Sequence, residues 1–198
     1  MPEQILETLF DSPVKVKLLK LFLRNPEKSF NMKDISEKTQ APFRSVSNEV
    51  DGLAGIGFLK DRRITKTKKG LPAGTYFSVS PDFDFYHELR SLVLKSSPTS
   101  KEKILKKVLR LGRIRLLLLA GIFLNSDNSR LDLFIVGDNV NHRKLSQFLK
   151  DIESEIGKEL AFAVMNSKEF YYRYHMFDRF VHDILEKPHE KLVNKLRI

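Results

Sequence analysis

Apolar side chains near the start of the chain recur at helical spacing. Segments 5–10 and 14–23 are predicted to be helices, and Asn25 with Pro26 ends the second one. Because this second helix carries a single apolar stripe, its charged side chains are expected to stay in solvent. They are Lys15, Lys17, Lys20 and Arg24.

Two further helices are predicted between Asn31 and residue 57. Asn31 can cap free backbone N–H groups, and Asp34 places a carboxylate in the first turn. A turn at 39–41 leads to Pro42, which suits the first turn of the next helix. The buried face and the end of that helix are predicted from apolar residues spaced i, i+4, i+7 and from two glycines: Val46, Val50, Leu53, Gly55 and Gly57.

A two-stranded ribbon is predicted next, from segments 58–60 and 75–79. Its tip is rich in cations that face a single acid, Asp61. The cations are Lys60, Arg62, Arg63, Lys66, Lys68 and Lys69. Such a tip suits contacts to phosphate groups.

A helix at 86–95 and a run of turn-forming residues at 96–100 close the first half of the chain. We therefore predict one domain at 1–96 and a second at 101–198. The apolar residues of the 86–95 helix either pack within the same chain or pair with a second copy, and the pattern does not decide between these. They are Leu89, Leu92, Val93 and Leu94.

The second half alternates helices and strands. Strands are predicted at 114–124, 131–136 and 159–165, and helices at 101–111, 145–156, from 167 onward and at 177–185. The uninterrupted apolar strands indicate a sheet covered on both faces. The chain is thus expected to be an α+β protein of two domains, the second an α/β arrangement of a small mixed sheet with flanking helices. The basic 101–111 helix is either a second nucleic-acid contact or a solvated face.

Composition narrows the function further. The formal net charge of +10 favours a polyanionic partner. The chain has no cysteine, which excludes disulfides, thiol catalysis and Cys-ligated zinc. The N-terminus lacks the pattern of a signal peptide, and the most apolar run, 116–124, is too short to cross a membrane. A cytoplasmic protein without a membrane partner is expected.

Three motifs resemble a winged helix-turn-helix domain of small prokaryotic transcription regulators: ISEKT at 35–39, RSVSNEV at 44–50 and LAGIGFL at 53–59. Gln40 departs from the family pattern, in which this turn often carries Gly. The resemblance implies a helix that enters the major groove of double-stranded DNA and a wing on the phosphates. The implied contacts are Lys33, Arg44, Ser45, Ser47, Asn48, Arg62, Arg63, Lys66, Lys68 and Lys69. A winged helix that binds only protein is the alternative.

The second half resembles the minimal nucleotidyltransferase fold of the polymerase-beta superfamily. The likeness rests on LAG at 119–121, SRLDLFIVGD at 129–138 and AVMNSKEF at 163–170. Active members place Gly-Ser on the phosphates and hold two metal ions with an Asp-x-Asp pair and a third carboxylate. Here Ile122 follows Gly121, Arg130 replaces the first acid and Asp132 matches the second. The third strand carries no carboxylate in its middle.

We therefore expect a nucleotidyltransferase fold without catalytic residues, metal or cofactor, in which Gly121, Arg130 and Asp132 are the remnant of a nucleotide cleft. Alternatives are that Asp127 supplies a replacement ligand, or that the cleft binds a nucleotide without turnover. Dimer formation or contact with another protein is the favoured role of this domain.

Two weaker signals lie near the C-terminus. The spacing of His175, Asp178 and His182 allows metal binding on helix faces, but such spacing often arises by chance. A cluster of aromatic side chains beside Arg173 suits either base stacking or core packing. Its members are Tyr171, Tyr172 and Tyr174.

The leading hypothesis from sequence is a homodimeric, DNA-binding transcription regulator whose second domain is a pseudoenzyme that assembles the protein or senses a ligand. Two other classes remain open. One is a nucleotidyltransferase that modifies a protein, an RNA or a small molecule. The other is a protein-interaction adaptor.

Overall fold

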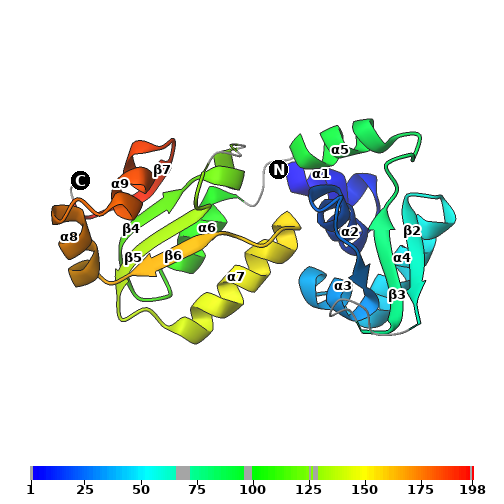
Figure 1. Ribbon diagram of the computed structural model, residues 1–198, viewed down its shortest axis with the longest axis horizontal. Coiled ribbons are helices and arrows are strands. Elements are labelled where there is room, and N and C mark those ends of the chain that lie inside the picture. Colours follow the sequence, from blue (N-terminus) through cyan, green and yellow to red (C-terminus); the bar gives the residue numbers. More distant parts are fainter. Residues whose placement is uncertain (1, 66–71, 96–99, 125, 127–128, 197) are drawn as a thin grey trace. The chain divides into compact units, whose positions relative to one another are not determined.

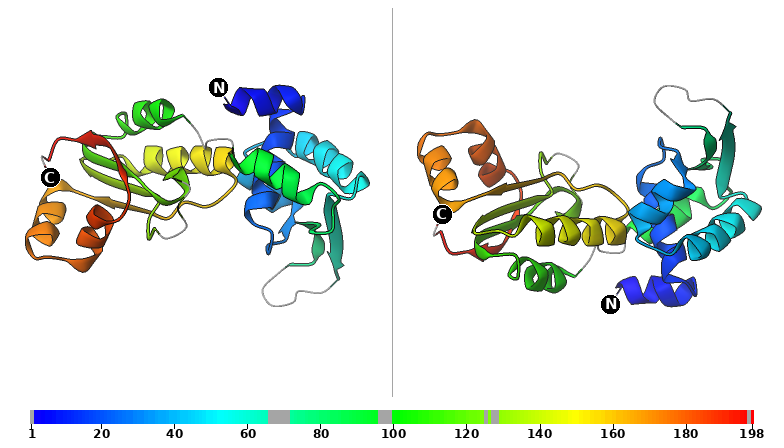
Figure 2. Two further views of the ribbon diagram at one scale, coloured as in Figure 1. Left: turned by 90° about the horizontal axis from the view of Figure 1, so that it is seen from above. Right: turned by 90° about the horizontal axis from the view of Figure 1, so that it is seen from below.

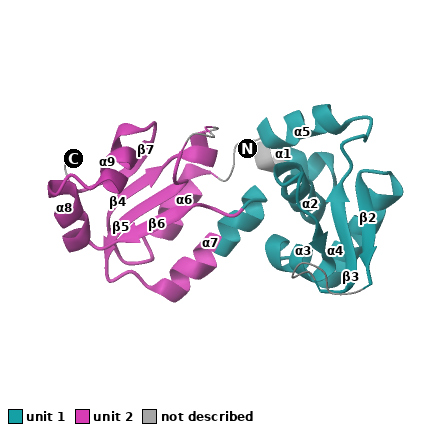
Figure 3. Cartoon of the chain, in the orientation of Figure 1, with its two compact units in different colours: residues 1–97, 150–158 teal, residues 98–149, 159–198 magenta. Residues whose placement is uncertain are grey.

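The computed structural model describes residues 2–65, 72–95, 100–124, 126, 129–196 and 198, without the side chains of residues 2–4. These residues form a mixed α+β fold of nine α-helices, a three-stranded antiparallel sheet and a four-stranded mixed sheet. The chain divides into two compact units, one of residues 1–97 with 150–158 and one of residues 98–149 with 159–198 (Figure 3). Residues 96–99 of the predicted linker lie outside the described residues.

The first unit contains five helices and three strands (Figure 1). In chain order they are α1 (Pro2–Leu9), α2 (Pro13–Arg24), β1 (Phe30–Asn31), α3 (Met32–Thr39), α4 (Phe43–Gly55), β2 (Leu59–Ile64), β3 (Gly74–Val79) and α5 (Tyr86–Lys95). The strand order is β1-β3-β2, and both pairs are antiparallel. The ribbon predicted from sequence is therefore present, with a first strand longer than expected.

Helix α2 lies at the centre of this unit and contacts α3, α4 and α5. Because three helices surround it, more of its surface is buried than one apolar stripe requires. The expectation of four solvated cations is accordingly wrong: Lys20 is 3% exposed and Arg24 is half-buried. Burial and the nearby Arg90 guanidinium lower the pKa of Arg24. Lys17 also folds back, because its Nζ donates to the carbonyl of Thr39 at 3.0 Å.

The ends of α3 and α4 follow from local chemistry. Asn31 caps the start of α3, as the sequence predicts, and Asp34 completes a reciprocal capping box with it. Helix α4 begins at Phe43, one residue after the expected Pro42, which occupies the N-cap position. The predicted inward face of α4 is confirmed, since its three apolar residues are buried: Val46, Val50 and Leu53.

Gln40 turns the chain between α3 and α4 in a left-handed conformation, with φ 50°. The N–H of Gln40 donates to Glu37 O, and the N–H of Ala41 donates to Ser36 O, which is the pattern of a Schellman cap. A glutamine thus adopts the conformation that glycine occupies at lowest cost. The tight turn forms despite the departure from the family pattern.

Helix α5 packs onto the core of its own unit. Val93 is fully buried, and Leu89 and Leu94 contact the same apolar cluster. Leu92 is 46% exposed. Packing within the chain therefore covers three of the four apolar residues, and pairing of α5 with a second copy stays a prediction.

The second unit contains three whole helices, a fourth whose residues 150–156 belong to the first unit, a short 3-10 helix and four strands. In chain order they are α6 (Lys101–Val108), β4 (Arg113–Leu119), η1 (Gly121–Leu124), β5 (Leu133–Asp138), α7 (His142–Ile156), β6 (Phe162–Met165), α8 (Ser167–His175), α9 (Arg179–Glu186) and β7 (Glu190–Asn194). The strand order is β6-β5-β4-β7, with β5 and β6 parallel and the other pairs antiparallel. Helices α6 and α7 cover one face of the sheet, and α8 with α9 covers the other (Figure 2).

Several boundaries in this unit differ from the sequence prediction. The strand expected at 114–124 ends at Leu119, because Gly121 has φ +51° and turns the chain into η1. The third strand begins at Phe162 instead of residue 159, and α6 ends at Val108, which leaves Leu109 45% exposed. The edge strand β7 was not predicted, since its residues lack a long apolar run.

Among the described residues, no helix combines the length and the apolar character needed to cross a membrane.

Gly57 and Gly52 allow a test of how backbone conformation limits substitution at the end of α4. Both have no heavy atom within 4 Å of an added Cβ, but Gly57 has φ +80° whereas Gly52 lies inside α4. We expect Gly57→Ala to lower the free energy of unfolding by roughly 1 kcal/mol, because alanine is strained in the left-handed region. Gly52→Ala should raise it by about 0.5–1 kcal/mol through reduced chain entropy. Urea denaturation of both variants measures their free energies of unfolding. Equal changes in the two variants would contradict the left-handed conformation of Gly57.

Candidate functional site

The outward face of α4 is the strongest candidate for a binding surface in the first unit. Arg44 and Asn48 are exposed, and Ser45 and Ser47 are half-buried beside them. These side chains lie opposite the buried apolar face that fixes the helix onto the core. None of the ion pairs among the described residues involves Arg44. The helix therefore presents donors and acceptors that the fold itself does not use.

Phe43 at the start of α4 was not predicted as a site residue. It is 59% exposed, although it is a large aromatic residue. Because it precedes Val46 by three residues and Val50 by seven, helical spacing places it beside the buried stripe, and no sequence signal identifies it as exposed. An exposed Phe beside polar groups can contact the methyl group of thymine, which is an apolar feature of the major groove.

The hairpin of β2 and β3 carries a second group of cations next to α4, which packs against β2. Arg62 and Arg63 are exposed, pair in register with Tyr76 and Thr75, and take part in none of the ion pairs that the described residues form. Lys60 differs, because its Nζ lies 2.6 Å from a carboxylate oxygen of Asp82. Its charge is thus partly balanced, contrary to the view that Asp61 is the one acid facing these cations.

The remaining predicted DNA contacts are less informative. Lys33 lies in the first turn of α3, is exposed, and has a long contact of 3.9 Å with Glu37. Three predicted wing residues lie outside the described part of the chain: Lys66, Lys68 and Lys69.

In the second unit, Asp132 connects three segments of backbone. Its Oδ1 accepts a hydrogen bond from the N–H of Ile122 (2.8 Å), and its Oδ2 accepts one from the N–H of Ala161 (2.9 Å). Gly121 is needed beside it, because a Cβ at this position would clash with Asp132 Oδ1. Both carboxylate oxygens therefore accept hydrogen bonds from backbone N–H groups, one in η1 and one directly before β6.

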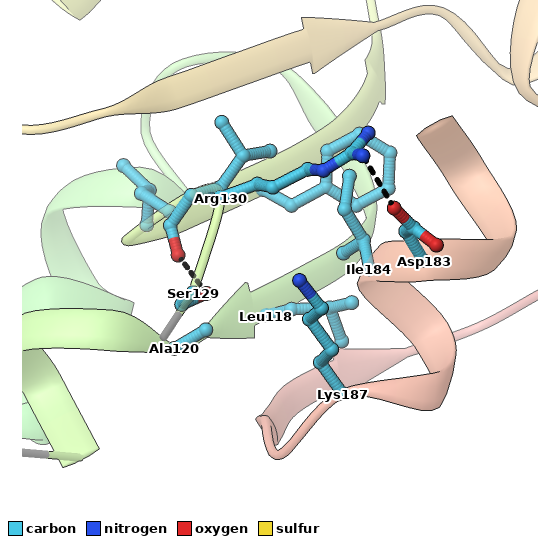
Figure 4. Close-up of a pocket in the computed structure, with 10 residues that line it drawn as sticks. Leu118, Ala120, Ser129, Arg130, Asp183, Ile184 and Lys187 are labelled. Carbon is cyan, nitrogen blue, oxygen red and sulfur yellow. Dashed lines mark hydrogen bonds and ion pairs between the residues drawn. The ribbon is translucent and has the colours of Figure 1, made fainter. Parts of the chain in front are cut away.

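Arg130 lies in a small pocket between the sheet and α9 (Figure 4). Its Nη2 is 3.0 Å from Oδ2 of Asp183, and Ser129 Oγ donates to the carbonyl of Leu131 at 2.6 Å. Lys187 lines the same pocket. The structure thus places Arg130 and Asp132 in different interactions, one with an acid on α9 and the other with backbone.

Strand β6 brings no further carboxylate to this cleft. Strand β6 carries the residues FAVM, and Asp127 lies outside the described residues. At the other end of β5, the N–H and Oγ of Ser167 donate to Asp138 at 3.0 and 2.8 Å, which lowers the pKa of Asp138. Within the described part of the chain, no three acidic or histidine side chains are arranged to hold a metal ion.

The C-terminal aromatic residues form a stack. The ring of His182 lies between those of Tyr174 and Phe177, with centroids 5.3 and 5.4 Å away. Asp178 caps α9 by accepting N–H groups of that helix. His182 and Asp178 therefore have structural partners. Arg173, the cation expected beside the tyrosines, lies 2.8 Å from Glu169.

Comparisons of this chain with protein-family models, curated proteins and solved structures found no match. The two resemblances therefore depend on the residues that carry them and on the contacts of those residues.

The arrangement at Asp132 predicts a structural cost for its removal. Asp132→Ala should lower the free energy of unfolding by about 1–3 kcal/mol, because the N–H groups of Ile122 and Ala161 lose their acceptor. Arg130→Ala is the control: it breaks a partly exposed ion pair and should cost less than about 1 kcal/mol. Urea denaturation followed by circular dichroism measures both, and a larger loss for Arg130→Ala would contradict this assignment.

Proposed function

We propose that this protein is a DNA-binding transcription regulator whose first unit is a winged helix-turn-helix domain. In this proposal α3, the turn at Gln40 and α4 form the helix-turn-helix, and the β2–β3 hairpin is the wing. The observation that carries it is the exposed, unpaired polar face of α4, with Arg44 and Asn48 opposite the buried residues of the same helix.

The chemistry of this face suits base reading in the major groove. An Asn side chain can bond both N6 and N7 of adenine, and an Arg can bond O6 and N7 of guanine. Asn48 and Arg44 are the residues of α4 that could make such contacts, and Phe43 adds an apolar surface for thymine. Arg62 and Arg63 on the wing would contact phosphates, which fix the register of the protein on DNA without reading sequence.

We assign a supporting role to the second unit. One reading helix recognises few base pairs, so a homodimer on two half-sites would provide the specificity. The second unit would be a nucleotidyltransferase-fold domain that assembles the dimer or senses a ligand, without catalysis. In support, both carboxylate oxygens of Asp132 are taken by backbone N–H groups, and Arg130 brings a cation where an active member has an acid.

In the test, the purified protein is first used to select the DNA sites that it binds from a mixture of genomic fragments. Fluorescence anisotropy then compares variants on the selected site and on a random duplex. We expect Asn48→Ala to weaken the selected site by about 1–3 kcal/mol and to leave the random duplex nearly unchanged. Arg62→Ala should weaken both duplexes by a similar factor and reduce the slope of log affinity against log salt by about 1.

Arg179→Ala serves as the matched control, because it removes an exposed guanidinium from the second unit. Its affinity for both duplexes should stay close to that of the wild type. If Asn48→Ala and Arg62→Ala lost the same factor on both duplexes, the division between base reading and phosphate contact would be wrong. If the wild type bound no duplex even at low salt, the DNA-binding proposal would fail and an adaptor role would be favoured.

A further inference from the structure

The second unit has an open pocket lined by cations at the start of β4. It is formed by the turn between α6 and β4, the first residues of β4 and the residue that follows β7. Its lining residues are Leu109, Gly112, Arg113, Ile114, Arg115 and Lys195. Three of these side chains are cationic and none is acidic, and a hollow lined by one sign of charge concentrates ligands of the opposite sign.

The charges that face this pocket remain largely unbalanced. Asp138, which pairs in register with Arg113, is the acid next to them. Its two carboxylate oxygens accept hydrogen bonds from Ser167, and its contact with Arg115 Nε is long, at 3.8 Å. Arg113 and Lys195 are exposed and belong to none of the ion pairs found among the described residues. A bound anion would therefore meet two cations that form no ion pair with the described residues and a third that is weakly paired.

The backbone around the pocket is held in place. Gly112 packs closely on the turn at the end of β5, since an added Cβ would lie 2.8 Å from Asn139 O and 2.9 Å from Asp138 O. The N–H of Lys195 donates to Arg115 O at 2.7 Å, which ties the end of β7 to β4. The exposed side chain of Leu109 adds an apolar wall. The cations are thus presented by fixed segments, which reduces the entropy lost on binding.

This pocket is separate from the cleft at Gly121 and Asp132. Strand β4 runs from Arg113 to Leu119, and the cleft residues follow its far end. A strand of this length spans roughly 20 Å. A ligand at Arg113 therefore lies at the opposite end of β4 from the cleft residues Gly121 and Asp132.

We infer that this pocket binds adjacent phosphate groups, through Arg113, Arg115 and Lys195. Guanidinium groups match phosphate oxygens with paired hydrogen bonds, and an ammonium group adds a point charge. The phosphates belong either to a free polyphosphate or nucleotide or to a nucleic-acid backbone. The inference does not require the first unit to bind DNA.

Isothermal titration calorimetry of the full-length protein with inorganic tripolyphosphate, at physiological salt, tests the site. The wild type should bind one molecule per chain. Arg113→Gln and Lys195→Gln should each weaken binding at least tenfold, because each removes one charge-assisted contact. Arg179→Gln, which removes an exposed cation elsewhere in the same unit, should stay within twofold of the wild type. Circular dichroism confirms that each variant is folded.

A second titration with a random DNA duplex separates the two sources of phosphate. If Arg113→Gln weakens tripolyphosphate binding alone, a free ligand is the source, and if it weakens both equally, nucleic acid is the source. The absence of saturable tripolyphosphate binding by the wild type would overturn the inference. So would an equal loss in Arg179→Gln, or a loss confined to an Arg62→Gln and Arg63→Gln double variant, which would place the anion on the first unit.

Discussion

Hydrogen bonds from backbone N–H groups to short polar side chains fix the ends of the elements in both units. Asn31 caps α3, Asn166 and Asp178 cap α8 and α9, and Asp132 accepts N–H groups at the ends of two segments. The first four N–H groups of a helix have no partner within it, so an element that begins in a folded interior needs such an acceptor. These acceptors decide where α3, α8 and α9 start, and the cap of α3 also positions the turn that leads into α4, which begins after Pro42 without a side-chain cap of its own.

The sequence predicts those parts of the fold in which one local rule acts alone. The cap at Asn31, the buried face of α4 and the end of α7 at Ile156 each follow from residue type and spacing. Predictions failed where tertiary packing decides the outcome. Lys20 is buried where Gly157, more than a hundred residues later in the chain, packs on its backbone, and no pattern within α2 reveals this neighbour. Strand β7 is stabilised by pairing with β4 and has no apolar signature of its own.

Among the candidate surfaces too, sequence predicts those that follow from a local pattern and misses those that depend on tertiary packing. The polar face of α4 could be predicted because it is the complement of an apolar stripe. Phe43 was missed because an aromatic residue is normally assigned to the core. The pocket at Arg113 could not be found from sequence, since Arg113 and Arg115 of β4 meet Lys195 only through the pairing of β4 with β7. Charge counts alone indicate an anionic partner but not where it binds.

The hydrogen bonds of Asp132 constrain how this chain could evolve. Exchanging Arg130 for aspartate would create the sequence spacing of an Asp-x-Asp pair, yet it would leave both oxygens of Asp132 bonded to the N–H groups of Ile122 and Ala161. Those N–H groups would need other acceptors before the carboxylate could turn toward a cation. The gain of a metal site at Asp132 would thus demand coordinated changes in two loops, a step that single substitutions do not provide.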